Sequence, residues 1–539
     1  MILATVLIAA TLLPPDTAAI SIIPRPASIT LEPGHFTLNS STVIVADSAG
    51  LGLGRQLADY LEPATGFRLT VRAGEADNNT IILRYDTALV QLGPEGYRLE
   101  VRTGRVMIRA TYSAGLFYGM QSLRQLFPPA ILREAKVDNV AWWAPAVTIE
   151  DYPRFSWRGG HLDVCRHFMP KEFVKKYIDL LALHKMNSFH WHLTEDQGWR
   201  IQIRRYPRLT EIGAWRRETL VGRLLNDPSS RVFDGVRHGG YYTQDDIREV
   251  VAYARARFVN VVPEIEMPGH SQAAIAAYPE LGVYNNQVDV LTLWGVSENI
   301  LNVEETTIQF MQNVLQEVLE LFPGPFIHIG GDEAVKTHWR NSARVQARMR
   351  ELGVKTEDEL QSWFIHRMDD FLTGQGRRLV GWDEILEGGL APNATVMSWR
   401  GIQGGITAAR AGHDVVMAPQ SHTYFDHYQS RNRDAEPLAI GGYTPIDSAY
   451  AFDPMPPNLE PQFRRHILGA QAQHWTEYIK TPKQVEYMMF PRLSALAEAV
   501  WTPLDRKDFG NFMDRLNRHL ERLQVLDVNY RPLEPAVIF

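Results

Sequence analysis

The chain has 539 residues, of which 45% are hydrophobic and 22% charged, a balance typical of a globular protein with material for a sizeable core. This length exceeds one ordinary core, so we expect two domains, one of them large. The net charge of −7 gives no basic surface for nucleic acid. The single cysteine, Cys165, excludes an intramolecular disulfide, a CxxC redox pair and a cysteine-built zinc site.

The N-terminal segment resembles an export signal. Residues 2–13 are apolar and are followed by two prolines and small residues, like a signal peptide's apolar region and cleavage site. The run is too short to span a membrane, so no membrane association is predicted. No Lys or Arg precedes it, which leaves a mis-set start or an N-terminal strand as alternatives. We expect residues 1–19 to be a signal peptide of a periplasmic or secreted bacterial enzyme.

Residues 20–150 mix strand and helix patterns and predict a small α+β domain. No catalytic constellation is visible in this part of the sequence. The pattern includes a hairpin that turns at Thr103-Gly104. The expected strands are 42–45, 80–83, 97–101 and 106–109, and the expected helices are 51–61 and 112–126.

From residue 151 onward, strands alternate with amphipathic helices. Eight such strands predict an α/β fold, a closed (β/α)8 TIM-type barrel that occupies residues 151–539 and follows the small α+β domain. The last helix, 507–525, carries apolar residues at helical spacing, and we expect it to pack on the barrel's side. The expected strands are 155–164, 187–193, 260–267, 325–330, 378–382, 395–399, 414–418 and 467–474.

The fourth of these strands belongs to the segment that points most directly to a catalytic site, Pro325-Phe-Ile-His-Ile-Gly-Gly-Asp-Glu-Ala334. It reads as a buried strand that opens into a tight turn bearing two adjacent carboxylates, Asp332 and Glu333. Like charge and partial burial disfavour double ionisation, so we expect one of the two carboxyl groups to hold its proton tightly and to serve as a general acid. The alternative is a solvated turn that caps the next helix.

Other polar and aromatic residues follow nearly every expected strand, where such barrels carry their chemistry. Trp382, Trp399 and Trp475 would wall an aromatic pocket, and nearby carboxylates with an Arg would reach hydroxyl groups, as a carbohydrate ligand requires. Each tryptophan could instead be core. His190, His192 and His270 could ligate zinc, but no HExxH-type helix supports a metal, so neither metal nor cofactor is predicted.

Several strings, taken in order, resemble the signatures of the β-N-acetylhexosaminidases of glycoside hydrolase family 20, over nearly the whole chain. Glu195 and Glu266 stand where the family more usually has Asp, which leaves the details of the acid network open. The strings are Trp157-Arg-Gly, Leu162-Asp-Val-Cys-Arg-His-Phe168, His190-Trp-His-Leu-Thr-Glu-Asp-Gln-Gly-Trp-Arg200, Pro263-Glu-Ile-Glu-Met-Pro-Gly-His270, His328-Ile-Gly-Gly-Asp-Glu333, Gly381-Trp-Asp-Glu384, Tyr424-Phe-Asp-His-Tyr-Gln429 and Gln471-Ala-Gln-His-Trp-Thr-Glu477.

The resemblance implies a role for each site residue. Glu333 would be general acid and then base, for which we expect a raised pKa caused by the neighbouring Asp332 and a partly apolar pocket. Asp332 would orient and charge-stabilise the substrate's 2-acetamido group. Tyr424 would donate a hydrogen bond to the acetamido oxygen, and the three tryptophans named above would enclose the acetamido methyl group and the sugar face. The sugar hydroxyls would be held by Arg158, Asp426 and Glu477. The supporting residues would be Asp163, Glu266, His270 and His328.

The resemblance implies an exo-acting, retaining β-N-acetylhexosaminidase that removes terminal N-acetylglucosamine or N-acetylgalactosamine from chitooligosaccharides or glycoconjugates by substrate-assisted catalysis. A lacto-N-biosidase-like exo-glycosidase and a non-catalytic barrel that binds N-acetyl sugars are the alternatives. The natural glycan, the preference between gluco and galacto forms and the oligomeric state stay open. A carbohydrate is the one partner that the sequence predicts.

Overall fold

The computed structural model describes residues 20–75 and 77–533. They form two compact units, one made of residues up to Tyr152 together with Asp505–Asp527, the other of Pro153–Leu504 with the residues from Val528 on. The predicted signal peptide lies outside the described residues. Among the described helices, none has the length and apolar character that a membrane span requires.

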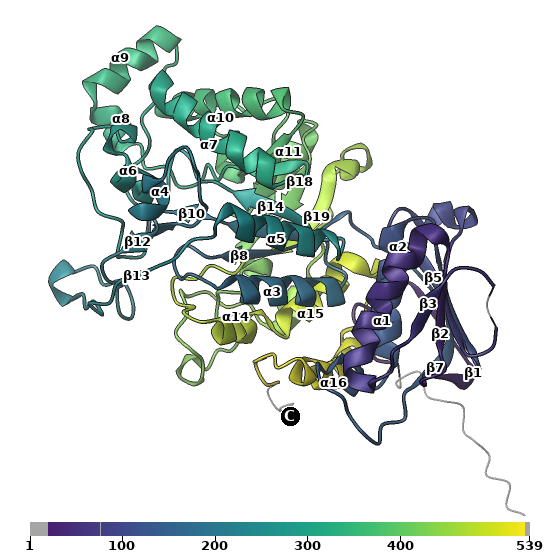
Figure 1. Ribbon diagram of the computed structural model, residues 1–539. Coiled ribbons are helices and arrows are strands. Elements are labelled where there is room, and N and C mark those ends of the chain that lie inside the picture. Colours follow the sequence, from purple (N-terminus) through teal and green to yellow (C-terminus); the bar gives the residue numbers. More distant parts are fainter. Residues whose placement is uncertain (1–19, 76, 534–539) are drawn as a thin grey trace, which may run out of the picture. The chain divides into compact units, whose positions relative to one another are not determined.

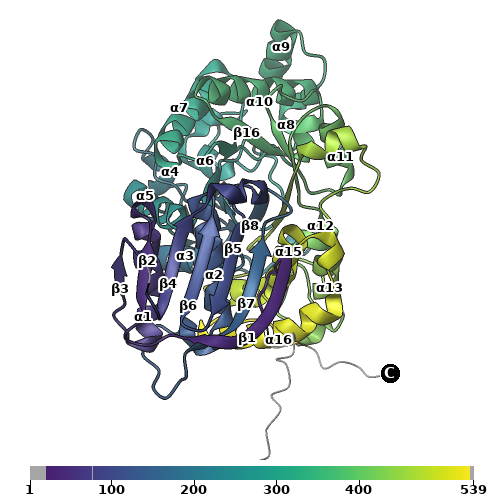
Figure 2. The ribbon, with the colours of Figure 1, turned by 90° about the vertical axis from the view of Figure 1, so that its right-hand side faces the viewer.

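The first unit is built on a seven-stranded sheet with the order β1-β7-β5-β6-β4-β2-β3 (Figure 2). The strands from β1 to β6 in this order pair antiparallel, and those from β6 to β3 pair parallel. The predicted hairpin is present as β5 and β6, with Gly104 at a φ of +75° in its turn. The bounds are β1 (Ser28–Thr37), β2 (Val43–Ala46), β3 (Thr70–Arg72), β4 (Thr80–Tyr85), β5 (Tyr97–Arg102), β6 (Arg105–Ala110) and β7 (Trp143–Asp151).

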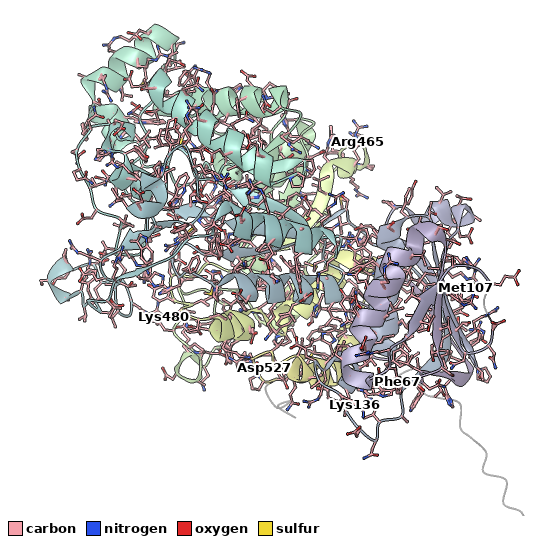
Figure 3. All side chains as sticks on the ribbon, in the orientation of Figure 1. Phe67, Met107, Lys136, Arg465, Lys480 and Asp527 are labelled. Atoms are coloured by element: carbon pink, nitrogen blue, oxygen red, sulfur yellow. The ribbon has the colours of Figure 1, made fainter. Side chains whose placement is uncertain are left out.

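Helices α1 (Leu51–Thr65) and α2 (Ser113–Leu126) cover one face of this sheet (Figure 1). Successive side chains of a strand point to opposite faces, so Val106 and Ile108 of β6 are buried, while Met107 extends from the other face (Figure 3). The predicted small α+β domain is therefore confirmed.

Helix α16 (Phe509–Val525) belongs to the first unit and not, as the predicted range 151–539 implied, to the barrel unit. Its buried face includes Phe512 and Leu516, and Arg522 Nη1 donates to the carbonyl oxygen of Ser21 at 2.7 Å. The helical spacing of its apolar residues correctly indicates a buried face. Spacing alone does not identify the surface that covers that face.

The second unit is a closed barrel of eight parallel strands in the order β14-β15-β16-β17-β18-β19-β8-β9, as predicted. Each of the eight expected ranges contains one of these strands. Their bounds are β8 (Trp157–Asp163), β9 (Ser188–His192), β14 (Asn260–Glu264), β15 (Phe326–His328), β16 (Arg378–Trp382), β17 (Thr395–Ser398), β18 (Val415–Met417) and β19 (Ile467–Ala472).

Amphipathic helices line the outside of this barrel (Figure 1). Thr243 caps α5 in a reciprocal capping box with Asp246, and Thr481 caps α14 with Pro482 in its first turn. The helices are α3 (Lys171–Leu183), α5 (Gln244–Arg255), α6 (Gln272–Ala277), α7 (Glu305–Leu321), α8 (Thr337–Asn341), α9 (Ala343–Leu352), α10 (Glu357–Gly374), α11 (Gln403–Arg410), α12 (Gln420–Thr423), α13 (Ile446–Ala451), α14 (Pro482–Met489) and α15 (Arg492–Trp501).

An irregular excursion separates β9 from α5 at the carboxyl end of the barrel. It contains the short elements β10 (Thr194–Glu195), β11 (Gly198–Trp199), α4 (Arg208–Glu211), β12 (Trp215–Arg216) and β13 (His238–Gly239). Excursions at this end of a (β/α)8 barrel shape the active site, because the loops that follow the strands converge there.

Candidate active site

The two adjacent carboxylates directly follow two glycines whose backbone conformation favours glycine. After β15, Gly330 and Gly331 adopt φ values of +68° and +90°. A Cβ atom on Gly330 would lie 1.7 Å from Glu266 Oε2, so no other residue fits there without movement. Glu333 also has a positive φ, +44°, which is a strained backbone conformation of the kind that gathers at functional sites. This turn carries Asp332 and Glu333 to the barrel's carboxyl rim.

A cavity of about 330 Å³ opens at this rim, near the lower end of the range for ligand sites. It brings together most of the predicted site residues from the ends of different strands, as expected for a barrel enzyme. Its lining includes Arg166, His270, Asp332, Glu333, Trp382, Trp399, Gln420, Tyr424, Asp426, His427, Ile440, Gly441, Gly442, Trp475 and Glu477.

Aromatic rings form one side of the cavity. The ring centroids of Trp382 and Trp475 are 5.7 Å apart, and those of Trp399 and Tyr424 are 6.1 Å apart with 25° between their planes. The indole N–H of Trp382 donates to Glu264 at 2.8 Å, so this ring is anchored from below. Apolar faces held in this way suit the apolar face and methyl group of an N-acetylated sugar.

His270 bridges the acidic pair to a second carboxylate. Its Nδ1 lies 2.7 Å from Glu195 Oε1, and its Nε2 lies 3.5 Å from Asp332 Oδ2 and 3.6 Å from Glu333 Oε2. Burial disfavours the imidazolium, but the charges of Glu195 and Asp332 outweigh it and raise the pKa of His270 well above its usual value. His270 is therefore a buried cation that faces both acids.

The two acids titrate in the opposite order to the one predicted. Burial raises the pKa of Asp332 to about 6, supported by Glu264 and Glu333 and opposed by His270. The interaction with His270 lowers the pKa of Glu333 below its usual value, against a smaller effect of burial. The predicted raised pKa of Glu333 is therefore wrong for the open pocket, because 42% of this side chain is exposed and a cation faces it.

Glu266 is a third acid beneath this pair. Neither of its carboxylate oxygens has a hydrogen-bond partner among the described residues. Burial, followed by the charges of Asp332 and Glu264, raises the pKa of Glu266 well above its usual value. Glu266 is thus held neutral beside Asp332, which limits the negative charge in this part of the site.

The opposite end of the cavity is polar. Asp426 is buried there and Glu477 is half-buried, and one oxygen of each, Oδ1 and Oε2, is buried without a partner among the described residues. Burial raises the pKa of both carboxyls, and for Asp426 the charge of Glu477 adds to it. Arg166 lines the same end, with its guanidinium 5.1 Å from the centroid of Trp475. Acids and a guanidinium in one part of the cavity are suited to bind sugar hydroxyl groups.

Arg158 does not belong to this site, and its predicted contact with sugar hydroxyls is wrong. It is the second residue of β8, at the end of the barrel away from the cavity, and it is fully buried. Its Nε and Nη1 each donate at 2.8 Å to the carbonyl oxygens of Lys185 and Phe155. Arg166, which follows the carboxyl end of the same strand, occupies the cavity instead. The position within the strand was the available signal, because chemistry gathers after the strand.

Two predicted supporting residues act at a distance from the acidic pair. Asp163 accepts from the backbone N–H groups of Cys165 and Thr476 at 2.7 and 3.0 Å and lies 3.3 Å from Arg166 Nη1. It therefore holds Arg166 and not the pair Asp332 and Glu333. His328 Nδ1 lies 2.9 Å from Glu264 Oε1 and 3.0 Å from the backbone nitrogen of Gly330, where it supports the turn.

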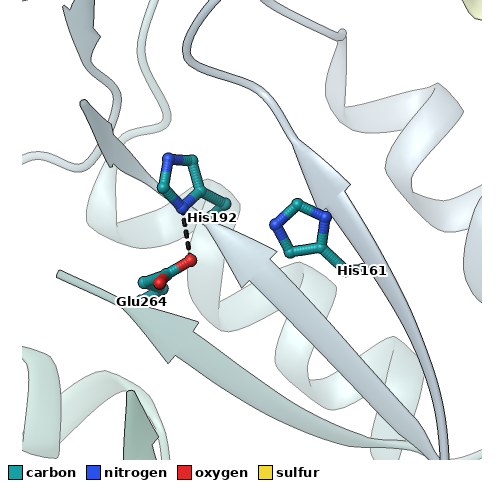
Figure 4. A group of neighbouring side chains, drawn as sticks. All are labelled: His161, His192 and Glu264. Carbon is teal, nitrogen blue, oxygen red and sulfur yellow. Dashed lines mark hydrogen bonds and ion pairs between the residues drawn. The ribbon is translucent and has the colours of Figure 1, made fainter. Parts of the chain in front are cut away.

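The barrel interior beneath the cavity holds a group that sequence reasoning did not single out, centred on Glu264. Its carboxylate contacts ring nitrogens of His190, His192 and His328 besides the indole of Trp382. The nearest of these contacts, to His192 Nδ1, is drawn in Figure 4 beside His161. The sequence did contain a signal for this group, because polar side chains inside buried strands need hydrogen-bond partners among one another.

This group has the composition of a metal site, because ligand atoms of His161, His192 and Glu264 lie within 4.8 Å of one another. The same residues also pair with one another. Burial opposes charging of His192, but Glu264 and Glu195 raise its pKa to about 10. The pKa of Glu264 is lowered well below its usual value, chiefly by the histidines against the effect of burial. A buried ion pair between His192 and Glu264 therefore satisfies both residues.

Comparison with known proteins matches both units. The family profile described as glycosyl hydrolase family 20, catalytic domain, matches residues 155–504, and that of domain 2 matches residues 19–152. A beta-hexosaminidase of Porphyromonas gingivalis is 44% identical over 96% of this chain, which spans 65% of that relative's length. A beta-N-acetylhexosaminidase of Cellulomonas fimi is 31% identical over 94% of each chain.

Solved structures agree in fold along nearly the whole chain. The family 20 beta-N-acetylhexosaminidase of Streptomyces coelicolor superposes with a TM-score of 0.83 at 33% identity, covering 97% of this chain and 99% of that one. A mutant beta-hexosaminidase of Streptomyces plicatus, solved with its product GlcNAc, gives the same TM-score and identity with 97% and 98% coverage.

Proposed function

Because the chain belongs to glycosyl hydrolase family 20, we propose that it is an exo-acting, retaining β-N-acetylhexosaminidase that removes terminal N-acetylglucosamine or N-acetylgalactosamine. The observation that carries this proposal is the cavity of about 330 Å³, which combines aromatic rings, acids with unpartnered oxygens and the pair Asp332 and Glu333. Its volume suits a single sugar, which supports action at the end of a glycan. The export predicted from residues 1–19 stays a prediction.

The placement of the acids supports a mechanism in which the substrate supplies the nucleophile. Retaining glycosidases with a protein nucleophile place two carboxyl groups about 5–5.5 Å apart on opposite sides of the scissile bond. Asp332 and Glu333 are consecutive, and both face the same nitrogen of His270, at 3.5 and 3.6 Å. Such a pair is poorly placed to flank a sugar ring. The carbonyl oxygen of the substrate's own acetamido group takes the nucleophile's place.

In the first step, Glu333 transfers a proton to the glycosidic oxygen as the bond from that oxygen to the anomeric carbon breaks. The acetamido oxygen bonds to the anomeric carbon with its own electron pair and forms a cyclic oxazolinium. Asp332, as carboxylate, faces the ring nitrogen and offsets its positive charge. In the second step, Glu333 removes a proton from water, and the water oxygen attacks the anomeric carbon. The bond from the acetamido oxygen to that carbon breaks, which reopens the oxazolinium ring and gives net retention of configuration.

Glu333 must be protonated when the glycan arrives, although His270 lowers its pKa in the open pocket. A bound sugar displaces water from the exposed part of the Glu333 side chain, and loss of water favours its neutral form. The ionised Asp332 beside it acts in the same direction. The substrate therefore helps to set the protonation state that the first step needs.

A lacto-N-biosidase-like enzyme would have to seat a disaccharide in the same cavity, whose size fits one sugar better. A barrel that binds N-acetyl sugars without cutting them would have no use for a strained acidic turn. Release of para-nitrophenol from N-acetylglucosaminide, N-acetylgalactosaminide and lacto-N-bioside substrates tests all three. We expect release from one or both monosaccharides and none from the disaccharide. Binding of N-acetylglucosamine without release from any substrate would overturn the proposal.

A further inference from the structure

The side chain of Trp399 lines two cavities. One is the substrate cavity, and the second, of about 340 Å³, includes Gln361, Glu384, Glu387 and Arg400 in its lining. Trp399 and Glu333 line both cavities. The orientation of this one ring therefore decides the shape of the substrate cavity on that side.

Glu384 holds the ring from the second cavity. It lies in the short turn Asp383–Leu386 directly after β16, and its Oε2 accepts the indole N–H of Trp399 at 2.9 Å. Tyr424 lies against the ring on the substrate side, with 25° between the two ring planes. We infer that Glu384, which does not line the substrate cavity, is a positioning residue that orients Trp399 and so determines how large an N-acyl group the enzyme accepts.

Arg400 and neighbouring acids limit the positions that the Glu384 side chain can take. Arg400 Nε lies 2.9 Å from Asp383 Oδ1 and 3.7 Å from Glu384 Oε1, while Arg400 Nη1 lies 2.9 Å from Glu387 Oε1. Burial, followed by the charge of Asp332, raises the pKa of Glu384 to about 8. At neutral pH the carboxyl is therefore uncharged and still offers an acceptor oxygen to the indole. Glutamine offers the same acceptor, whereas leucine offers none.

The inference rests on the proposed function, because it takes the substrate's N-acyl group to lie against Trp399. Its test is a double-mutant cycle read out as a ratio, kcat/KM for a para-nitrophenyl N-propanoylglucosaminide over that for the N-acetyl compound. Glu384→Leu should raise this ratio by about threefold or more, and Trp399→Phe, which keeps a ring but loses the N–H, should raise it likewise. Adding Glu384→Leu to Trp399→Phe should change the ratio little further. Glu384→Gln should retain the ratio of the unchanged enzyme.

Glu387→Gln is the matched control, because Glu387 pairs with the same Arg400 without contacting Trp399, and it should leave the ratio unchanged. A folded Glu384→Leu enzyme with the original ratio would overturn the inference. If that variant does not fold, an unchanged ratio in Trp399→Phe overturns it equally, because the hydrogen bond is then lost from the other side. Failure of the unchanged enzyme to cleave either compound would instead refute the proposed function.

Discussion

His270 and Asp332 face each other with 3.5 Å between Nε2 and Oδ2, and this contact joins a buried cation to the carboxylate that the proposed reaction needs in ionised form. The same imidazole lies 2.7 Å from Glu195, at its other nitrogen. The charge of His270 is therefore stabilised on both sides. It opposes the effect of burial, which alone would hold Asp332 protonated.

Removal of this cation should alter the pH dependence of the reaction. In the substrate complex, where the bound sugar favours protonated Glu333, the reaction still needs Asp332 in its ionised form. The pKa of Asp332 is raised to about 6, so this form is lost as the pH falls through that value, and kcat should decline below about pH 6. His270→Asn removes the positive charge and should move this acidic limb to higher pH by about one unit or more. The measurement is a pH profile of kcat. His35→Asn, a change in the N-terminal unit, is the control, and an unmoved limb in His270→Asn would contradict the assigned role.

The general acid should matter in proportion to the leaving group. Glu333→Gln cannot donate a proton, so hydrolysis of a chitooligosaccharide should slow by about 10² to 10⁴-fold. The aryloxide of an aryl glycoside leaves with little protonation, so hydrolysis of that substrate should slow much less. Initial rates on both substrates measure the difference. Equal losses would remove Glu333 from the role of acid.

Two arginines of the same segment should respond in opposite ways to the same substitution. Arg166→Lys removes a planar fork from the polar end of the cavity and should lower kcat/KM by about tenfold or more, without large loss of stability. Arg158→Lys disturbs two buried hydrogen bonds to carbonyl oxygens and should lower the free energy of unfolding by about 1–3 kcal/mol. Steady-state kinetics and thermal melting of both variants separate the cases. A kinetic defect confined to Arg158→Lys would restore the original prediction.

The group around Glu264 should contribute mainly to stability. Glu264→Gln leaves the buried His192 cation without its partner and should lower the free energy of unfolding by about 3–5 kcal/mol. Glu249→Gln is the control, because Glu249 is an exposed acid that pairs with Lys171 and Lys175, and it should cost at most about 1 kcal/mol. Urea denaturation of both variants gives the comparison. Equal stabilities would show that the ion pair to His192 does not hold the barrel together.

The sequence predicted the barrel because strand patterns alternate regularly with helices that carry strong local signals, such as the Thr243 cap. It predicted the pocket because Trp382, Trp399 and Trp475 each lie at or just beyond the carboxyl end of a strand. It did not assign α16 to the correct unit or Arg158 to the correct end of its strand. Both depend on tertiary packing, which residue spacing does not encode.

The sequence also could not predict which residue of the acidic pair has the higher pKa. Two adjacent acids predict that one proton is held tightly, but not which residue holds it. The answer depends on the exposure of Glu333 and on the approach of His270 from a different strand. Likewise, the hydrogen bond from Trp399 to Glu384 joins the ends of β16 and β17 and has no signature in either segment.

The central claim is that the substrate's acetamido oxygen is the nucleophile, and the most direct test is kcat/KM across para-nitrophenyl glucosaminides with N-acetyl, N-fluoroacetyl, N-difluoroacetyl and N-trifluoroacetyl groups. Each fluorine withdraws electrons from the carbonyl oxygen and weakens it as a nucleophile, while the protein's own carboxylates are unaffected. We predict a steep, progressive fall in kcat/KM with the number of fluorines. A flat series would show that a protein carboxylate attacks the anomeric carbon, and the mechanism proposed for Asp332 and Glu333 would be wrong.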